Sequence, residues 1–212
     1  MSIRLVLASA SPARLASLRA AGLDPEVMVS GVDETAEGSE ADARALCMRL
    51  AAAKAAGVAQ RLAGEPVLVV GCDSVLEFDG EVYGKPGSAE LAVSHWRRMR
   101  GRSGTLHTGH CVLSTGDGSG LTKLASTRVH FADVSDAEIE AYVATGEPLQ
   151  VAGAFTLDGL GGAFVTAVEG DPHTVVGISL PLLREMFAEL GVAWTEMWPQ
   201  HLTRPADRAR ER

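Results

Sequence analysis

The sequence lacks the features that mark several classes of protein. Its three cysteines are widely spaced along 212 residues and form no Cys-x-x-Cys pair, so they indicate buried, reduced thiols rather than a zinc or redox site. No apolar run approaches the roughly 18 residues that a transmembrane helix needs. The apolar run near the start, from Leu5 to Ala8, is too short for a secretion signal. We therefore expect a cytoplasmic protein with no membrane partner.

Basic charge is also scarce. The formal net charge of −8 argues against general nucleic-acid binding, because nucleic-acid phosphates require a basic face. An anionic substrate must then be met by a local cluster of cations. The only basic run lies in residues 196–212, which we interpret as a frayed C-terminal tail. Residues 1–195 are long enough to form one domain with its own core, without disulfides.

Strand and helix patterns alternate irregularly along the chain. Helices are predicted directly after Ser11 and at residues 41–62, 88–99, 135–143 and 180–190. Strands are predicted at residues 3–8, 26–30, 67–70, 75–78, 81–83, 105–114, 121–131, 153–157 and 163–168. This order predicts an α/β or mixed α+β fold in which helices flank a mixed central sheet.

Asp73 is the first candidate for chemistry. It follows the apolar strand 67–70 closely, and the carboxyl ends of strands are where open α/β sheets bind ligands. The next strands form a hairpin around Asp79 and Gly80, and its register, continued outward, would pair Ser74 with Lys85. Lys85 would then return beside Asp73. The two charges suit either a salt bridge or a metal-bound phosphate, and a simple turn aspartate is the alternative.

Lys54 is a second candidate. It lies four and eight residues after Leu50 and Leu46, so it continues the apolar stripe of its predicted helix. A cation on a stripe that faces the core needs an anionic partner. The alternative is that the side chain extends past its neighbours to solvent.

The start of the first helix is a third candidate. Ser11 suits the N-cap and Pro12 the first helical position. Together with Ser9 and Arg14, the free N–H groups at this helix end could bind a phosphate. The alternative is an ordinary serine cap beside a surface arginine.

Carboxylates offer a metal site, whereas histidines do not. Glu34 and Asp73 carry the hard oxygen ligands that Mg²⁺ or Mn²⁺ prefers, and phosphate oxygens would complete the shell. A solvated turn is the alternative for Glu34. His107 and His110 are three apart in a predicted strand and so face opposite ways. The glycines at 159, 161 and 162 favour a turn or bulge over a phosphate cradle.

Taken in order, these segments resemble the motifs of the Maf nucleotide pyrophosphatases, and the likeness extends to about Gly191. The matching segments are Leu7-Ala-Ser-Ala-Ser-Pro-Ala-Arg14, Val32-Asp-Glu34, Arg49-Leu-Ala-Ala-Ala-Lys54, Gly71-Cys-Asp-Ser74, Gly84-Lys-Pro86, Gly146-Glu-Pro-Leu149, Ala152-Gly-Ala154, Gly159-Leu-Gly161 and Val175-Val-Gly177.

The resemblance implies a two-lobed fold similar to inosine triphosphate pyrophosphatases, with a cleft between the lobes, a divalent metal and commonly a homodimer. It implies hydrolysis of a nucleoside triphosphate to the monophosphate and pyrophosphate. By motif position, Asp73 would accept the proton and Glu34 would help to bind metal. Arg14, Lys54 and Lys85 would hold the triphosphate.

Three positions stand where members of the family differ with their substrate. These are Ala13, Ser74 and Asp158, and the chain follows neither of two known patterns completely. An ionised Asp158 can only accept hydrogen bonds, so it suits the donors of guanine or cytosine better than the edge of uracil or thymine.

A non-catalytic, nucleotide-binding regulator is the rival interpretation, since the resembled family has also been associated with arrest of septum formation. Such a protein could keep Arg14, Lys54 and Lys85 for binding, but it would not need a base. The presence of Asp73 and Glu34 favours the enzyme. A purely structural protein would leave the cations unexplained.

Overall fold

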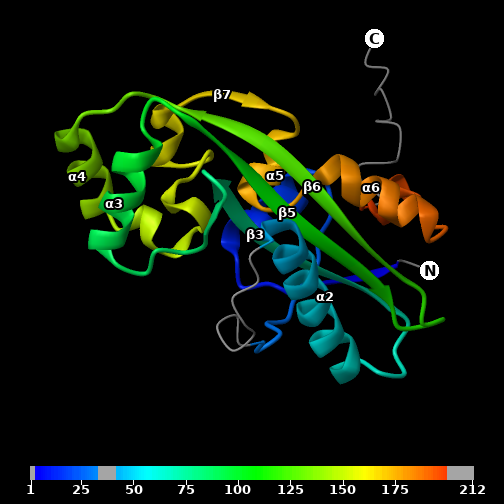
Figure 1. Ribbon diagram of the computed structural model, residues 1–212. Coiled ribbons are helices and arrows are strands. Elements are labelled where there is room, and N and C mark those ends of the chain that lie inside the picture. The colour runs from blue at the N-terminus through cyan, green and yellow to red at the C-terminus, as the bar shows by residue number, and fades with distance from the viewer. Residues whose placement is uncertain (1–2, 33–41, 200–212) are drawn as a thin grey trace, which may run out of the picture.

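A mixed sheet forms the centre of the computed structural model, which describes residues 3–32 and 42–199. Within those ranges the sheet has seven strands in the order β2-β1-β3-β5-β6-β7, with β4 paired to β3 (Figure 1). β1 runs parallel to β2 and β3, and the other pairs are antiparallel. The strands are β1 Arg4–Leu7, β2 Glu26–Val27, β3 Val67–Phe78, β4 Glu81–Tyr83, β5 Ser103–Ser114, β6 Gly120–Phe131 and β7 Val165–Glu169.

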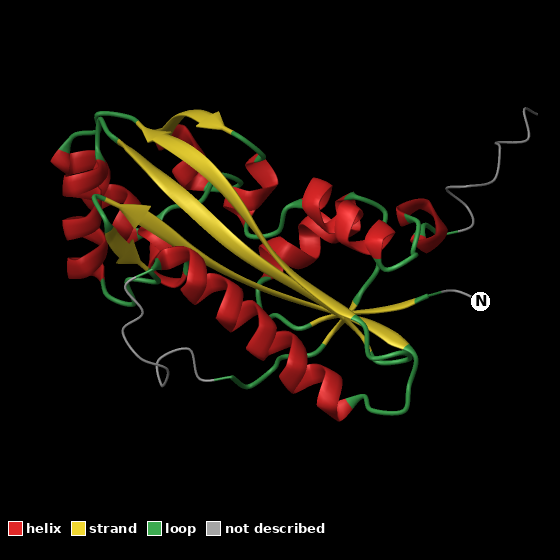
Figure 2. Ribbon diagram, turned by 45° about the vertical axis from the view of Figure 1, so that its right-hand side comes forward, coloured by secondary structure: helices red, strands yellow, loops and turns green. Residues whose placement is uncertain are grey.

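Helices cover both faces of this sheet. The long helix α2 runs along one face, and the remaining α-helices pack against the opposite face (Figure 2). The α-helices are α1 Pro12–Ala20, α2 Ala43–Arg61, α3 Ala89–Met99, α4 Asp136–Ala144, α5 Pro172–Val176 and α6 Leu180–Glu189. Short 3₁₀ helices are η1 Glu147–Gln150, η2 Ala152–Ala154, η3 Leu160–Phe164 and η4 Trp194–Met197. None of the helices in the described ranges is long and apolar enough to cross a bilayer.

Several local predictions are confirmed. The fold is a mixed sheet flanked by helices, as expected. Ser135 caps α4 in a reciprocal capping box with Glu138. The hairpin turns at Asp79 and Gly80, whose φ angles of 52° and 76° are those of the tight turn that favours this dipeptide.

Two strand predictions are wrong. The segments 67–70 and 75–78 are one uninterrupted strand, β3. Residues 153–157 form no strand, because the chain turns through η2 with positive φ angles at Gly153 (70°) and Ala154 (60°). A β-carbon at Gly153 would lie 2.7 Å from the side chain of Leu76, so the chain passes very close to β3 at this point.

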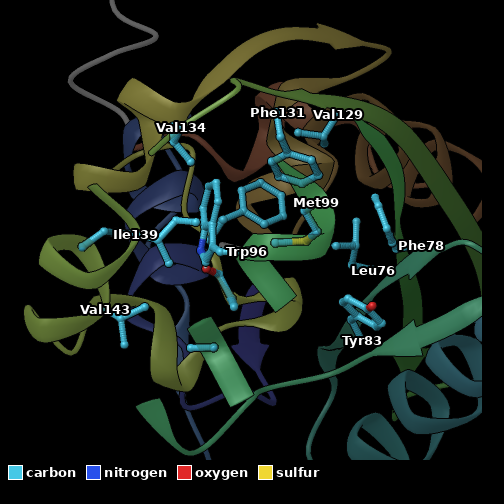
Figure 3. Packing of buried hydrophobic residues seen from close by; sticks show 14 of the residues in the cluster. Leu76, Phe78, Tyr83, Trp96, Met99, Val129, Phe131, Val134, Ile139 and Val143 are labelled. Carbon is cyan, nitrogen blue, oxygen red and sulfur yellow. The ribbon is translucent and has the colours of Figure 1, made fainter. Parts of the chain in front are cut away.

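A polar row divides the face of the sheet opposite α2. On β3 the side chains up to Cys72 belong to an apolar cluster with α1 and α6. Those from Leu76 onward belong to another cluster, built around Trp96 of α3 with α4 (Figure 3). Ser74 lies between them, opposite Thr108 of β5, and their hydroxyl oxygens are 2.9 Å apart. The two lobes and their cleft stay predictions, but this polar row separates the two clusters.

The three cysteines are buried and unbridged, as predicted. Burial raises the pKa of Cys72 to about 12, and burial together with the nearby charge of Asp73 raises that of Cys47 to about 12. Both therefore remain neutral thiols near neutral pH and are poor nucleophiles or metal ligands.

The expected tail begins inside the described ranges. Of residues 196–212 the structure describes 196–199, and the first two of these are the end of η4. The indole N–H of Trp198 donates to the backbone oxygen of Ala21 at 3.0 Å. The extent of the tail beyond 199 stays a prediction.

Candidate active site

The candidate site is built on a gap along one edge of β3. β1 pairs with this edge up to Val70, and β4 pairs with it from Leu76. β5 occupies the other edge from Leu68 to Glu77. Residues 71–75 therefore have no strand neighbour on the first edge among the described residues. Side chains can approach the backbone there.

Arg14 of α1 reaches the gap with its guanidinium group. Its Nη1 donates to the backbone oxygen of Cys72 at 2.9 Å and to the hydroxyl of Ser9 at 3.1 Å. Its Nη2 donates to the hydroxyl of Ser74 at 3.1 Å, and its Nε to the backbone oxygen of Gly177 at 2.7 Å. All four acceptors are neutral, and Arg14 has no ion-pair partner within the described ranges. Its positive charge is therefore not compensated and can attract an anion.

The start of α1 places Arg14 there. Ser11 is the N-cap and Pro12 the first helical residue, as predicted, and the Ser11 hydroxyl accepts the N–H of Arg14. The Ser9 hydroxyl also accepts the N–H of Ser11 at 3.2 Å. Arg14 is half-buried, which excludes the alternative of an ordinary surface arginine. Phosphate binding at this helix end stays a prediction.

Lys54 and Asp73 form a buried ion pair on the α2 face of β3. The Lys54 Nζ is 2.6 Å from the Asp73 Oδ1, and the two side chains are only 8% and 9% exposed. The apolar-stripe argument for Lys54 is thus confirmed, and the alternative that it extends to solvent is wrong. A buried ammonium and a buried carboxylate each require such a partner, because charge is costly away from water.

Two glycines bring α2 close enough for this pair to form. A β-carbon at Gly71 would lie 2.3 Å from the backbone oxygen of Ala51, and one at Gly109 would lie 2.3 Å from that of Cys47. Since Gly109 is the β5 partner of Asp73, α2 rests directly on the backbone beside the carboxylate. Any larger residue at either position would push α2 away from the sheet.

The position of Asp73 differs from the prediction in two respects. It does not end a strand, because β3 continues to Phe78, but it lies three residues beyond the last pair with β1. Nor does the strand pairing of the hairpin continue as far as Lys85. The β3–β4 pairs end at Leu76 and Tyr83, because the chain then turns and the Gly84 oxygen accepts the N–H of Gly153.

For the remaining predicted site residues the structure gives fewer contacts. Lys85 and Asp158 are exposed, and Ala13 is half-buried. Ser74, expected to influence base choice, binds Arg14 and Thr108 through its hydroxyl. Glu34 lies outside the described residues. Their proposed roles all stay predictions.

Glu147 is a residue that sequence reasoning did not assign. Its carboxylate accepts the hydroxyls of Tyr142 at 3.0 Å and Thr156 at 2.5 Å, and the backbone N–H groups of Leu160 and Gly161, both at 3.0 Å. These N–H groups are therefore occupied, which agrees with a turn rather than a phosphate cradle at the glycines. The sequence did contain a sign of it, because Glu147 belongs to the matching motif Gly146-Glu-Pro-Leu149, but the motif alone gave its carboxylate no role.

Comparison with known proteins assigns the family. A model of the family described as "Maf-like protein" matches residues 4–190. The chain belongs to the Maf-like protein family. Maf-like relatives named nucleoside triphosphate pyrophosphatase include one from Salinispora tropica, 58% identical over 93% of this chain and 88% of its own length. Another, from Streptomyces coelicolor, is 55% identical over 92% of this chain and 94% of its own length.

A similarity to a solved structure is weaker than the similarities in sequence. The Staphylococcus aureus Ham1 protein aligns with a TM-score of 0.41 and 13% identity, covering 94% of this chain and 95% of that one. The family assignment does not depend on it.

Proposed function

We propose that this protein hydrolyses a nucleoside triphosphate to the monophosphate and pyrophosphate. The names of its relatives at 58% and 55% identity support this reaction. The structural observation that carries it is the pairing of two features on residues 71–75 of β3. Arg14 brings an uncompensated positive charge to one face, and Asp73 presents a carboxylate on the other.

Each charged side chain has a proposed role. Arg14 binds phosphate oxygens through the guanidinium N–H that its four neutral acceptors do not use. The N-terminus of α1, with Ser9 and Ser11, assists it. Lys54 and Lys85 stabilise the charge that develops on the leaving pyrophosphate. Asp73 takes the proton from the water that attacks the α phosphorus, and the ion pair with Lys54 holds its carboxylate in place.

The family resemblance also implies a divalent metal, and the residues present are compatible with one. No group of three or more His, Cys, Asp or Glu side chains in the described ranges could hold a metal alone. Mg²⁺, however, usually takes one or two carboxylates and fills its shell with water and substrate phosphates. Asp73 and Glu34 would hold it. When bound, it would polarise phosphate oxygens and lower the pKa of a bound water.

The rival function is a nucleotide-binding regulator without catalysis. Such a protein needs the cation of Arg14 but has no use for a buried carboxylate beside the phosphates. The protein has Asp73 at this position although burying its carboxylate against Lys54 costs desolvation free energy. A protein that only binds a nucleotide would avoid that cost. This observation favours catalysis.

A panel experiment separates the two functions. Pyrophosphate release is measured over ordinary and modified nucleoside triphosphates, with Mg²⁺, with Mn²⁺ and with EDTA. We expect release in either metal and none in EDTA. Tight nucleotide binding without pyrophosphate release under any condition would establish the regulator instead, and full activity in EDTA would show that the cationic side chains suffice.

The assembly and location are also proposals. We also propose a cytoplasmic homodimer, of which the resemblance implies only the dimer, and the net charge of −8 is consistent with the absence of a nucleic-acid partner. Light scattering on the purified protein tests the dimer directly.

A further inference from the structure

His110 of β5 is a buried polar side chain that the proposed chemistry does not use. It is 0% exposed and lies opposite Cys72, on the face of the sheet that carries Arg14. Burying an imidazole is costly unless its ring nitrogens are hydrogen-bonded. Here Nδ1 is 3.0 Å from the backbone oxygen of Thr108, and Nε2 is 2.8 Å from the backbone nitrogen of Ser179.

These two partners fix the state of the ring. A backbone oxygen can only accept, so Nδ1 carries the proton, and a backbone N–H can only donate, so Nε2 must be bare. His110 is therefore neutral. Burial, with the nearby charge of Arg14, lowers its pKa to about 4, in agreement with this geometry.

The Ser179 end of this contact leads to Arg14. Ser179 is the N-cap of α6, and two residues earlier the backbone oxygen of Gly177 accepts the Nε–H of Arg14 at 2.7 Å. Gly177 has a φ angle of 111°, and a β-carbon there would lie 3.0 Å from the Arg14 Nε. The main chain at Gly177 is thus pressed against the guanidinium group, so its position determines where that group lies.

The segment 171–179 depends on side chains of the sheet for its place. α5 has only five residues, too few for a helix that is stable alone. Thr108 donates its hydroxyl to the Thr174 oxygen, and Thr127 to the Asp171 oxygen, both at 2.9 Å. These bonds hold the start of the segment, and His110 holds its end, next to Gly177.

We propose that His110 is a positioning residue for the phosphate-binding arginine. By accepting the N–H of Ser179 with Nε2, it fixes the Gly177 oxygen and so aims the guanidinium of Arg14 at the substrate. An apolar residue would fill the same space but leave the 177–179 backbone without this anchor. The inference rests on the proposed function, because it assumes that Arg14 binds the triphosphate.

Matched variants test the anchor. His110→Phe keeps a ring but has no acceptor, His110→Gln places an amide oxygen near the position of Nε2, and His110→Asn is too short to reach Ser179. Each is measured below its unfolding temperature, for kcat and KM with the best triphosphate of the panel and for binding of inorganic tripolyphosphate by calorimetry. We expect His110→Phe and His110→Asn to raise KM and weaken tripolyphosphate binding about tenfold, the scale of one hydrogen bond, with kcat changed less. His110→Gln should recover most of this loss.

A control on the other face of the same strand separates positioning from general destabilisation. His107 is equally buried, and its two ring nitrogens bind Ser126 and Glu77, neither of which contacts Arg14. His107→Phe should destabilise the protein but leave KM within about twofold of the wild type, well under the scale of one hydrogen bond. If His110→Phe behaves like His107→Phe, or if His110→Gln binds no better than His110→Asn, the proposal is overturned.

Arg14→Met distinguishes failure of this inference from failure of the proposed function. If Arg14→Met weakens tripolyphosphate binding and the His110 variants do not, the positioning role alone is wrong. If Arg14→Met itself binds tripolyphosphate as tightly as the wild type, the phosphate-binding role of Arg14 is wrong, and the positioning role of His110 is wrong as well. Should His110→Phe not fold, the comparison between the Gln and Asn variants still decides the matter.

Discussion

The two faces of β3 treat buried charge in opposite ways. On the α2 face, Lys54 and Asp73 compensate each other at 2.6 Å and are almost fully buried. On the other face, the guanidinium of Arg14 is held by four neutral acceptors. A paired carboxylate can be held in position for proton transfer, whereas a cation with only neutral partners can attract an anion. The comparison teaches that the same five residues of one strand can support a reacting group and a binding group, because consecutive side chains point to opposite faces.

Breaking the compensated pair should have the largest effect. Asp73→Asn should lower pyrophosphate release by at least about a hundredfold, because the base is lost. It should also lower the free energy of unfolding by about 3–5 kcal/mol, because it breaks the buried ion pair with Lys54. Urea unfolding and a pyrophosphate assay measure the two effects.

The double variant Asp73→Asn with Lys54→Met sharpens this prediction. It removes both buried charges, so stability should recover toward the wild type while activity stays lost. Lys54→Met alone should be destabilised like Asp73→Asn. Wild-type stability in both single variants would contradict the buried pair, and activity in Asp73→Asn would contradict the base.

The Arg14 face should respond to pH through His110. Burial and the Arg14 charge lower the pKa of His110 to about 4 from its usual 6.5. The unfolded chain then binds a proton that the native protein does not, so stability is present above about pH 6.5 and is lost as pH falls toward 4. The wild type should lose roughly 3 kcal/mol more than His110→Gln over this range.

The difference between the wild type and His110→Gln cancels the titration of ionisable groups that both proteins share. Those that face His110 are Cys72 on β3, Lys123 on β6, Arg14 on α1 and Asp171 before α5. Parallel curves of unfolding free energy against pH for the two proteins would show that His110 is not held neutral.

Removing the uncompensated cation should reduce activity with a smaller loss of stability. Arg14→Met keeps the apolar stem of the side chain and leaves only neutral acceptors behind. The free energy of unfolding should therefore fall by no more than about 1–3 kcal/mol. The value of kcat/KM should fall about a hundredfold. Arg14→Lys, which restores the charge without the fork of donors, should recover part of it. A stability loss as large as that of Asp73→Asn would contradict the contrast between the faces.

The smallest effect is expected outside both faces, at Asp158. It is exposed in the turn that Glu147 organises, and it cannot donate to a base when ionised. Asp158→Gln should shift preference toward dTTP and UTP by about tenfold relative to guanine or cytosine nucleotides, the scale of one hydrogen bond. An unchanged ranking in the nucleotide panel would mean that this side chain points away from the base, and a wild-type preference for dTTP would refute the donor argument.

The sequence predicted those parts of the site that depend on periodicity. Lys54 was found because a cation on an apolar helical stripe requires a partner, and Asp73 because a carboxylate follows a buried strand closely. The cap at Ser11 followed from local chemistry. Each of these signals lies within about ten residues, a distance over which helix and strand geometry fixes direction.

What the sequence missed depends on contacts across the fold. α5 is too short for a periodic pattern, and it is held by Thr108 and Thr127 from distant strands. The register from Asp79 could not be continued to Lys85, because Gly84 bonds to Gly153, 69 residues further along the chain. Glu147 has four partners between five and 14 residues away, at no helical or strand spacing.

The most direct test of the account is hydrolysis of the preferred triphosphate in water enriched in ¹⁸O, with the products analysed by mass spectrometry. Attack of water on the α phosphorus, assisted by Asp73, predicts one ¹⁸O atom in the nucleoside monophosphate and none in pyrophosphate, and almost no product with Asp73→Asn. Label in pyrophosphate, or release of inorganic phosphate with a nucleoside diphosphate, would place the attack elsewhere and contradict the account.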